Sequence, residues 1–525
     1  MNTLIPLATE FTAPTINWWP LVPVMVVLGG AVVGVLLEAF VPAKHRRMVG
    51  IGWTVLVLVS AFVLTALQWS GALSAPGVVG EYVNDTLTVS LQMIVTLLGV
   101  LAVLVMADRS EVRDGAFAGQ PSDRPGSGEE ALTAAKKYQR SEMFPLTLFS
   151  VGGMMLFPAS DSLLTMFVAL EVMSLPLYIL AATARRRRDL SQEAAIKYFI
   201  LGSFAAAFFL MGSALLYGYS GGSLRLGAIA SALPVISNAD WLLMVGTLMV
   251  MMGLLFKVAV FPFHEWAPDV YSGAPTPVTG FMAAGVKVAA FGALLRFYVS
   301  VAGHLKWDFA LVLALLAAAT IIFGTVAGLV QKNIKRLLAY SSIAHAGFVL
   351  IGVLSLAKGS AGSIAFYLLA YGLATIGAFA VVTLVRRKDS LGAIGDEAQD
   401  IASWDGLAKK SPLLASAMLI FLLSFAGIPL TSGFVGKFVV FAMGIQGGLG
   451  WLVAIALVAS AVTAVFYFRV IAAMFMKEPA EGVEVVESEG MTSVVIAVAA
   501  IATVLLGIFP GPLLSFFEQI AILIP

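Results

Sequence analysis

Five ionisable side chains occur deep inside long apolar stretches of the sequence, and a set of this kind can move protons. They are Glu171, Lys257, Lys287, His345 and Lys437. A lysine at the centre of a membrane helix costs roughly 2.5–3.5 kcal/mol on insertion scales, which makes such residues rare outside functional sites. Low dielectric disfavours the charged form of a lysine, whereas a nearby carboxylate favours it. A lysine under both influences can take up and release a proton near neutral pH, and Lys257 with Glu171 is predicted to be such a pair.

The five side chains are predicted to lie at a similar depth in the membrane. Glu171, Lys287 and His345 follow the starts of their apolar spans by eight to ten residues. At ~1.5 Å per residue this is roughly 12–15 Å, about half of a ~30 Å hydrocarbon core. Lys257 and Lys437 lie deep in two spans that proline interrupts. We therefore predict a lateral proton relay at mid-depth, bridged by water, with uptake on one side and release on the other.

Each side chain also has a plainer structural explanation. A single buried histidine is as often a hydrogen-bonded core group, and Glu171 could form an ion pair that only fixes helix packing. The three lysines would each need a carboxylate of their own, and Glu171 is the clear candidate within the spans. A structural explanation therefore fits the whole set poorly. It does suit three residues near span ends, where long side chains reach the interface, namely Lys197, Arg296 and Arg469.

The composition indicates that helices crossing a bilayer position these residues. Of the 525 residues, 60% are hydrophobic and 12% are charged. A soluble chain of this length would carry more charge. Apolar runs close to the ~20 residues that a bilayer requires recur along the sequence. We predict an all-α polytopic membrane protein with about fourteen transmembrane helices, near residues 18–40, 49–69, 86–107, 143–159, 162–184, 195–218, 240–263, 277–302, 308–330, 337–357, 363–385, 412–445, 451–475 and 491–515.

The seventh and twelfth spans are predicted to be broken helices. Pro262 follows Lys257 by five residues, and Pro429 lies in "AGIPLTSGFVG", which indicates a break at Gly427 to Gly433. In lipid, irregular backbone is tolerated only where it is buried in protein or lines a wet cavity. Broken helices in both halves of a chain are also typical of transporters built from inverted repeats.

The spacing of the ionisable residues favours two inverted five-helix repeats. Lys257 and Lys437 are 180 residues apart, and Glu171 and His345 are 174 apart. About five helices separate each pair, and an odd number inverts the second copy. We divide the chain into residues 1–142 (three helices and a polar loop), 143–302 (first repeat), 303–475 (second repeat) and 476–525 (a loop and the last helix).

The basic loops predict the orientation. "AKHRR" (43–47), "RRRR" (185–188), "KNIKR" (332–336) and "RRK" (386–388) all follow odd-numbered spans. The positive-inside rule places them in the cytoplasm and both termini outside, in a cytoplasmic cell membrane. The polar segments 108–142 and 386–411 fall on the same side. The first is rich in Gly, Ser, Asp and Arg and is predicted to be a mobile loop rather than a docking segment for a partner.

Other chemistries lack the residues they need. The chain has no cysteine, which excludes disulfides and thiolate ligation of iron–sulfur clusters. Its four histidines, at 45, 264, 304 and 345, form no metal motif, and no dinucleotide or phosphate loop is present. The net charge of +1 gives no indication of a nucleic acid partner. We expect no redox centre in the chain, so energy for pumping must come from partners or from an ion gradient.

The motifs around these residues resemble a known family. "FKVAVFPFHEWAPDVYSGAPTPVTGFMAAGVKVAAF" (256–291) is similar to the signature of the antiporter-like membrane subunits of proton-pumping NADH:quinone oxidoreductase, complex I, which are related to Mrp-type antiporter chains. "PDVYSGAPTPVT" resembles the subunit N form rather than the L and M forms. "LEVMSLPLYIL", "AAIKYFILGS", "SSIAHAGF" and "AGIPLTSGFVGKF" agree in order, so the resemblance covers residues 140–475.

The resemblance implies a fourteen-helix fold with two inverted repeats and a role for each candidate residue. Glu171 would modulate Lys257, the central pumping lysine of the first half. Lys287 would be the connecting lysine, His345 part of the lateral relay, and Lys437 the lysine of the second broken helix. The segment 108–142 departs from the family by being longer and more charged than expected, which leaves the cytoplasmic contacts there open.

The resemblance also implies cofactors and partners outside this chain. The complex would use FMN, iron–sulfur clusters, NADH and a quinone in partner subunits, with no cofactor bound here. The Ala-, Gly- and Val-rich composition favours a high-GC bacterium that uses menaquinone. Expected neighbours are subunit M, the small membrane subunits and the lipid bilayer, with no nucleic acid.

Two alternatives stay open from the sequence. An Mrp-type sodium/proton antiporter or a membrane-bound hydrogenase chain would share the row of lysines but work with other partners. A secondary solute carrier built on inverted repeats should show a polar pocket for its solute instead of isolated lysines. Co-purification with flavin- and iron–sulfur-bearing subunits would favour complex I over both.

Overall fold

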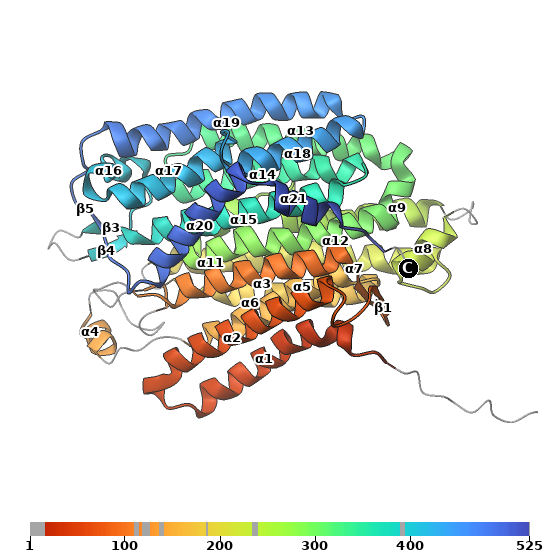
Figure 1. Ribbon diagram of the computed structural model, residues 1–525, viewed down its shortest axis with the longest axis horizontal. Coiled ribbons are helices and arrows are strands. Elements are labelled where there is room, and N and C mark those ends of the chain that lie inside the picture. Colours follow the sequence, from red (N-terminus) through yellow and green to blue (C-terminus); the bar gives the residue numbers. More distant parts are fainter. Residues whose placement is uncertain are drawn as a thin grey trace, which may run out of the picture.

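The structure is a bundle of long helices that run side by side along the longest axis of the molecule (Figure 1). The computed structural model describes residues 16–109, 115–117, 127–135, 141–184, 187–233, 240–388 and 394–523. The long and medium helices are α1 Val22–Phe40, α2 Ala43–Trp69, α3 Thr86–Ala107, α5 Met143–Leu156, α6 Leu163–Ala181, α7 Arg188–Tyr219, α9 Asp240–Val258, α12 Lys287–Ser300, α13 Lys306–Leu329, α14 Ile334–Ser355, α15 Ser360–Leu384, α17 Pro412–Ala426, α18 Ser432–Gln446, α19 Gly450–Met476 and α20 Met491–Ile508.

Short elements complete the described chain. The short helices are η1 Trp19–Leu21, α4 Gly128–Ala135, η2 Phe157–Ala159, α8 Leu226–Ala232, α10 Trp266–Gly273, α11 Thr276–Phe281, the π-turn η3 Met282–Val286, η4 Ala302–Leu305, η5 Ile401–Trp404, α16 Leu407–Lys410 and α21 Gly511–Glu518. The strands are β1 Gly77–Val79, β2 Tyr82–Asn84, β3 Val385–Lys388, β4 Ile394–Glu397 and β5 Val483–Val485.

The prediction of an all-α polytopic membrane protein is confirmed. Within the described residues, 12 helices are long and apolar enough to cross a membrane, and three shorter apolar ones are Met143–Ala159, Pro412–Ala426 and Ser432–Gln446. Each predicted span corresponds to one of these helices or, for the twelfth, to a pair of them. α17 and α18 are each shorter than a full span and together correspond to one predicted span. The predicted number of fourteen crossings therefore stays a prediction.

Burial separates the centre of the bundle from its lipid-facing rim. The spans Thr276–Ser300 and Ser360–Leu384 are 100% buried and Ile334–Ser355 is 94% buried, whereas Ala43–Trp69 is 28% buried. A helix surrounded by protein can carry polar side chains that a lipid-facing helix cannot. The central helices α11–α12, α14 and α15 are therefore the positions where ionisable groups are most easily accommodated.

Both predicted broken helices are interrupted. α9 ends at Val258 and the chain becomes helical again at Trp266, with Pro262 between. α17 ends at Ala426, and α18 begins at Ser432. Gly427 ends α17 in the left-handed conformation, with φ at 80°, and its N–H donates to the carbonyl oxygens of Leu423 and Ser424. Glycine adopts this conformation without steric cost, which explains why the helix stops there.

The second break depends on a close approach that only glycine allows. A Cβ at Gly433 would lie 1.9 Å from the carbonyl oxygen of Ser424. Gly433→Ala is therefore expected to destabilise the protein by ~1–3 kcal/mol, because the two half-helices must move apart. The thermal midpoint of the detergent-purified protein measures the effect. Gly52→Ala is the matched control, since nothing lies within 4 Å of a Cβ there, and equal midpoints for the two variants would contradict the expectation.

The two ends of the bundle carry small sheets that the sequence did not predict. The antiparallel sheet β4-β3-β5 lies at one end, and the hairpin β1-β2 lies at the other (Figure 1). In the first sheet Arg386 pairs with Glu397 on β4 and with Glu484 on β5. The predicted polar segment 386–411 is thus ordered in its described part. Most of 108–142, predicted as a mobile loop, lies outside the described residues, and α4 within it is helical.

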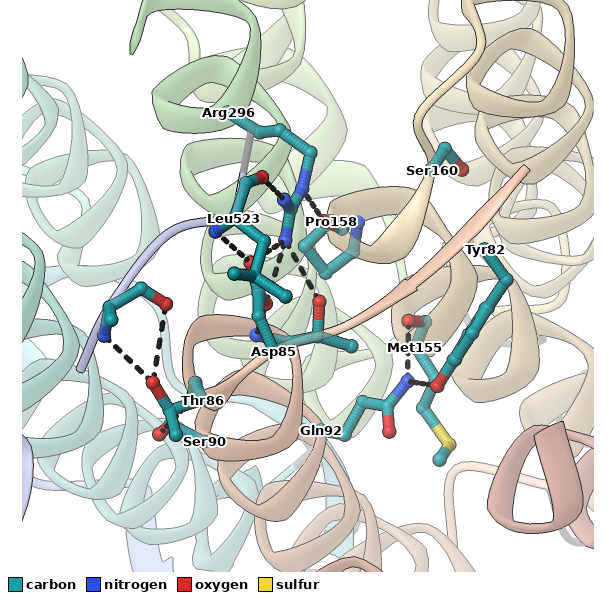
Figure 2. A network of polar contacts seen from close by, with 12 residues as sticks. Tyr82, Asp85, Thr86, Ser90, Gln92, Met155, Pro158, Ser160, Arg296 and Leu523 are labelled. Carbon is teal, nitrogen blue, oxygen red and sulfur yellow. Dashed lines mark hydrogen bonds and ion pairs between the residues drawn. The ribbon is translucent and has the colours of Figure 1, made fainter. Parts of the chain in front are cut away.

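A buried ion pair ties the C-terminal segment to the centre of the bundle (Figure 2). Arg296 Nη2 donates to both carboxylate oxygens of Asp85 at 2.9 Å, and Arg296 Nε donates to Pro158 O at 2.6 Å. Leu523 N donates to Asp85 Oδ2 at 3.0 Å, and Leu523 O accepts from Arg296 Nη1 at 3.2 Å. Both charged side chains are 1% exposed. Arg296 is thus structural, as expected, but it pairs inside the protein instead of reaching the interface.

Candidate functional site

Lys257 and Glu171 lie on two helices that face a shared polar position. Lys257 is 1% exposed and is the last residue but one of α9, directly before the break. Its Nζ donates to Ser174 Oγ at 2.8 Å. Ser174 is three residues after Glu171 on α6, so both side chains lie on the same face of that helix. Ser174 Oγ accepts from Lys257 and itself donates to Leu170 O, so no hydrogen bond in the described residues links it to Glu171.

The two charges interact without a direct ion pair. Lys257 and Glu171 are coupled electrostatically, but no ion pair between them is present within the described residues. Glu171 Oε1 is buried and makes no hydrogen bond to the described residues. The Nζ of Lys257 also lies 5.3 Å from the ring centre of Tyr198 and 5.5 Å from that of Tyr178. The ring of Phe256 lies 5.9 Å away, so a hydroxyl and three aromatic rings surround this lysine, and among the described residues its one hydrogen-bond acceptor is the serine.

Lys287 occupies the centre of the bundle. It begins α12 directly after the π-turn η3 and is 3% exposed. Local π-turns shift the register of a helix and occur frequently at functional sites. The Nζ donates to the backbone carbonyl oxygen of Ser342 on α14, and it lies 5.4 Å from the ring centre of Tyr371. No carboxylate within the described residues forms an ion pair with it.

His345 lies near both Lys287 and Lys437. Its Nδ1 is hydrogen-bonded to Tyr367 Oη at 2.7 Å, and its Nε2 is 3.5 Å from Tyr467 Oη. Its charge is coupled to those of Lys437 and Lys287. A neutral imidazole donates at one nitrogen and accepts at the other, so a histidine between two hydroxyls can pass a proton across its ring.

Lys437 is held by the end of the helix before the break. Its Nζ donates to Phe425 O at 2.8 Å, to Ala426 O at 3.0 Å and to Ser460 Oγ at 2.8 Å. The last carbonyl groups of a helix lack partners within the helix, and here α17 presents two of them to the lysine. Three acceptors match the three N–H groups of an ammonium. The break itself thus creates the binding site for this side chain.

The structure brings the five residues into two groups. Glu171 and Lys257 form one, and Lys287, His345 and Lys437 form the other. No hydrogen bond or ion pair in the described part of the chain joins the groups, but α9 and α12, which carry Lys257 and Lys287, pack against each other. Lys257 precedes its break, whereas Lys437 follows its own. The 180-residue spacing of these lysines therefore does not reflect equivalent places in two repeats.

One buried lysine was missed by the sequence analysis. Lys335, counted there among the basic residues of a cytoplasmic loop, is 0% exposed at the start of α14. Its Nζ donates to Ala274 O at 2.8 Å. A Lys next to Asn333, Lys332 and Arg336 looks like a loop residue, so no local signal in the sequence distinguishes it. The tyrosines that contact His345 were also missed, because tyrosine in an apolar span is usually a packing residue.

The remaining charged residues near span ends have surface partners. Lys197 forms ion pairs with Glu193 at 2.6 Å and Asp269 at 2.8 Å. Arg469 donates to the carbonyl oxygens of Leu329 and Gln331. Among the residues that the structure describes, no three His, Asp or Glu side chains gather as a metal site would require. Lys335 is thus a further buried ionisable group beside the row of lysines.

Comparisons with known proteins assign the family. The family model described as NADH:quinone oxidoreductase/Mrp antiporter, TM, matches residues 160–463. NADH-quinone oxidoreductase subunit N of Beutenbergia cavernae is 49% identical, over 97% of this chain and 99% of that protein. The same subunit of Acidothermus cellulolyticus is 47% identical, over 97% and 96%.

The chain belongs to the NADH-quinone oxidoreductase subunit N family.

Solved structures agree with membership of the subunit N family. A chain of respiratory complex I from Thermus thermophilus is 35% identical, with a TM-score of 0.75 over 94% of this chain and 98% of that one. A chain of the Mrp complex from a Dietzia species has the same TM-score of 0.75 at 21% identity, over 95% and 96%. The Mrp likeness shows the shared fold alone. The sequence identity therefore favours the complex I family over the Mrp alternative.

Proposed function

We propose that this subunit N chain translocates protons through Glu171, Lys257, Lys287, His345 and Lys437, driven by electron transfer from NADH to a quinone in partner subunits. The observation that carries the proposal is the row of buried ionisable groups, in which four of the five have hydroxyl, carbonyl or tyrosine partners at hydrogen-bonding distance. Such groups in a membrane interior are typical of proton relays.

The proposal assigns a different task to each of the two groups of residues. In the first, the charge of Glu171 controls how tightly Lys257 holds its proton, and Ser174 accepts the hydrogen bond of the lysine. In the second, His345 exchanges protons with Lys287 and Lys437 through the neighbouring hydroxyls. Transfer between the groups passes from α9 to α12, with water as the bridge. The two inverted repeats, at 143–302 and 303–475, supply one broken helix each.

The surroundings of the chain follow from the same proposal. The complex holds FMN, iron–sulfur clusters, NADH and a quinone, menaquinone in a high-GC bacterium, in subunits other than this one. Subunit M and the small membrane subunits are its neighbours. The basic loops face the cytoplasm, and both termini face outward across the cytoplasmic membrane. The end of α1 near the N-terminus and the C-terminal end lie at the same end of the bundle (Figure 1), which agrees with both termini lying on one side of the membrane.

Neutralising Glu171 tests the first half of the relay. Glu171→Gln is expected to slow proton translocation by about tenfold, because the amide keeps the shape but removes the charge that acts on Lys257. The measurement is the initial rate of proton uptake into vesicles containing the intact purified complex, together with the protons moved per electron.

A matched carboxylate on the neighbouring helix serves as the control. Glu193 of α7 is 56% exposed and pairs only with Lys197 among the described residues, so Glu193→Gln is expected to pump as the parent does. A proton-to-electron ratio and rate in Glu171→Gln equal to those of this control would contradict the proposed role.

A further inference from the structure

An open cavity lies at the end of the bundle that carries the sheet β4-β3-β5. Its volume is about 440 Å³. Its wall includes Arg187, Arg386, Asp396 and Glu397, and its floor includes Ala274 and Thr276. Ala274 and Thr276 flank Pro275 at the start of α11, so the cavity reaches from the polar end of the molecule to the beginning of a fully buried helix. A cavity with this lining admits water and protons.

Lys335 lies directly below this floor. Its Nζ donates to the carbonyl oxygen of Ala274, the residue that lines the cavity. No carboxylate within the described residues forms an ion pair with Lys335, although its charge is coupled to those of Glu397 and Asp396. A fully buried lysine without an ion-pair partner is costly, which makes a function more plausible than a packing role.

Glu397 provides a fixed negative charge in the cavity wall. Its Oε2 accepts from Thr276 Oγ1 at 2.5 Å and pairs with Arg187 Nη2 at 2.7 Å. Burial raises the pKa of Glu397, but the charges of Lys335, Arg187 and Arg386 outweigh burial and lower it to about 2. Glu397 is therefore ionised at neutral pH. It cannot itself carry the proton, but it attracts positive charge to the floor of the cavity.

α14 connects this cavity with the row of lysines. Lys335 and Ser342 are seven residues apart on α14, which is roughly 10 Å along a helix at ~1.5 Å per residue. The carbonyl oxygen of Ser342 accepts from Lys287 Nζ. The Ser342 hydroxyl is buried beside the hydroxyls of Tyr271 and Tyr371. A proton that reaches Lys335 is thus two helical turns from the hydrogen-bond partner of Lys287.

We propose that Lys335 is the group through which protons from the side of the basic loops reach Lys287, and that Glu397 is a positioning residue whose negative charge offsets the arginines of the cavity wall. The inference rests on the proposed function, since it supplies the relay with its proton uptake site. It gives a function to Lys335, a buried cation that is not one of the five relay residues.

The test compares Lys335→Met and Glu397→Gln in the intact complex, reconstituted so that the basic-loop face is outside. Both variants are expected to slow proton translocation by about tenfold at neutral pH. Glu397→Asp should restore most of the rate. In Glu397→Gln, acidifying the outer solution should also restore part of the rate, because a higher proton concentration compensates for weaker attraction.

The matched control and Lys257→Met separate the possible outcomes. Glu484 lies in the same sheet and pairs with Lys388 at an exposed position. The variant Glu484→Gln should therefore pump normally. If Lys335→Met and Glu397→Gln pump normally while Lys257→Met does not, this inference fails and the proposed function survives. A loss of pumping in Glu397→Gln that acidification does not change also overturns the inference, because Lys335 and Glu397 would then have only a structural role. Normal pumping by Lys257→Met would instead overturn the proposed function.

Discussion

Replacing Lys257 by methionine is expected to reduce proton translocation by the intact complex by about 10²-fold or more. Lys257 is the ionisable group at the first break, and its Nζ donates to Ser174 Oγ while its charge is coupled to that of Glu171. Methionine has a similar length and fills the space among Tyr178, Tyr198 and Phe256, but it carries no proton. The variant therefore removes the transfer step with little change in packing.

The measurement must separate loss of pumping from loss of assembly. Proton uptake by vesicles and electron transfer from NADH to quinone are recorded on the same preparation, and native gels report whether the complex is complete. Lys358→Met is the control, because Lys358 is exposed in the turn between α14 and α15. An unchanged number of protons per electron in a complete Lys257→Met complex would contradict the role assigned to this lysine.

The transmembrane elements could be predicted because lipid imposes a length and a polarity on them. The span predicted at 86–107 coincides with α3, and the break predicted in 412–445 separates α17 from α18. No soluble core provides so strict a rule. The rule weakens at the ends of the helices, where polar residues are allowed. There the prediction placed Lys335 in a loop, although it lies inside the protein.

The partners of the site residues could not be predicted, because they come from distant parts of the chain. Tyr467 is 122 residues from His345, and Glu397 is 121 residues from Thr276. β5 joins β3 across the whole of α17 to α19. Depth in the membrane is readable from one helix, whereas a contact depends on how the helices pack. The sequence therefore identified the ionisable residues that are buried among the helices but not the hydroxyl and carbonyl groups that contact them.

Replacing Asp85 by asparagine is expected to destabilise the chain by about 3–5 kcal/mol, the usual cost of leaving one partner of a buried ion pair unpaired. Arg296 would remain 1% exposed and charged among Thr88 Oγ1 and the carbonyl oxygens of Pro158 and Leu523. Asp85 also caps α3, since its side chain accepts from Thr88 N at 2.8 Å. Asparagine caps a helix as well as aspartate does, so the substitution isolates the loss of charge from the loss of the cap.

The effect should be measured as the thermal midpoint at which the chain is lost from the purified complex. Asp400→Asn is the control, because Asp400 pairs with Arg387 at an exposed position, and surface pairs contribute only ~0–1 kcal/mol. Proteolysis should also release the C-terminal segment more readily in Asp85→Asn, because Leu523 N donates to Asp85 Oδ2. The double variant Asp85→Leu with Arg296→Met should recover part of the loss, since apolar residues of similar volume often replace a buried pair without cost. Equal midpoints for Asp85→Asn and Asp400→Asn would show that Arg296 reaches water after all, and the C-terminal segment would then be held by packing alone.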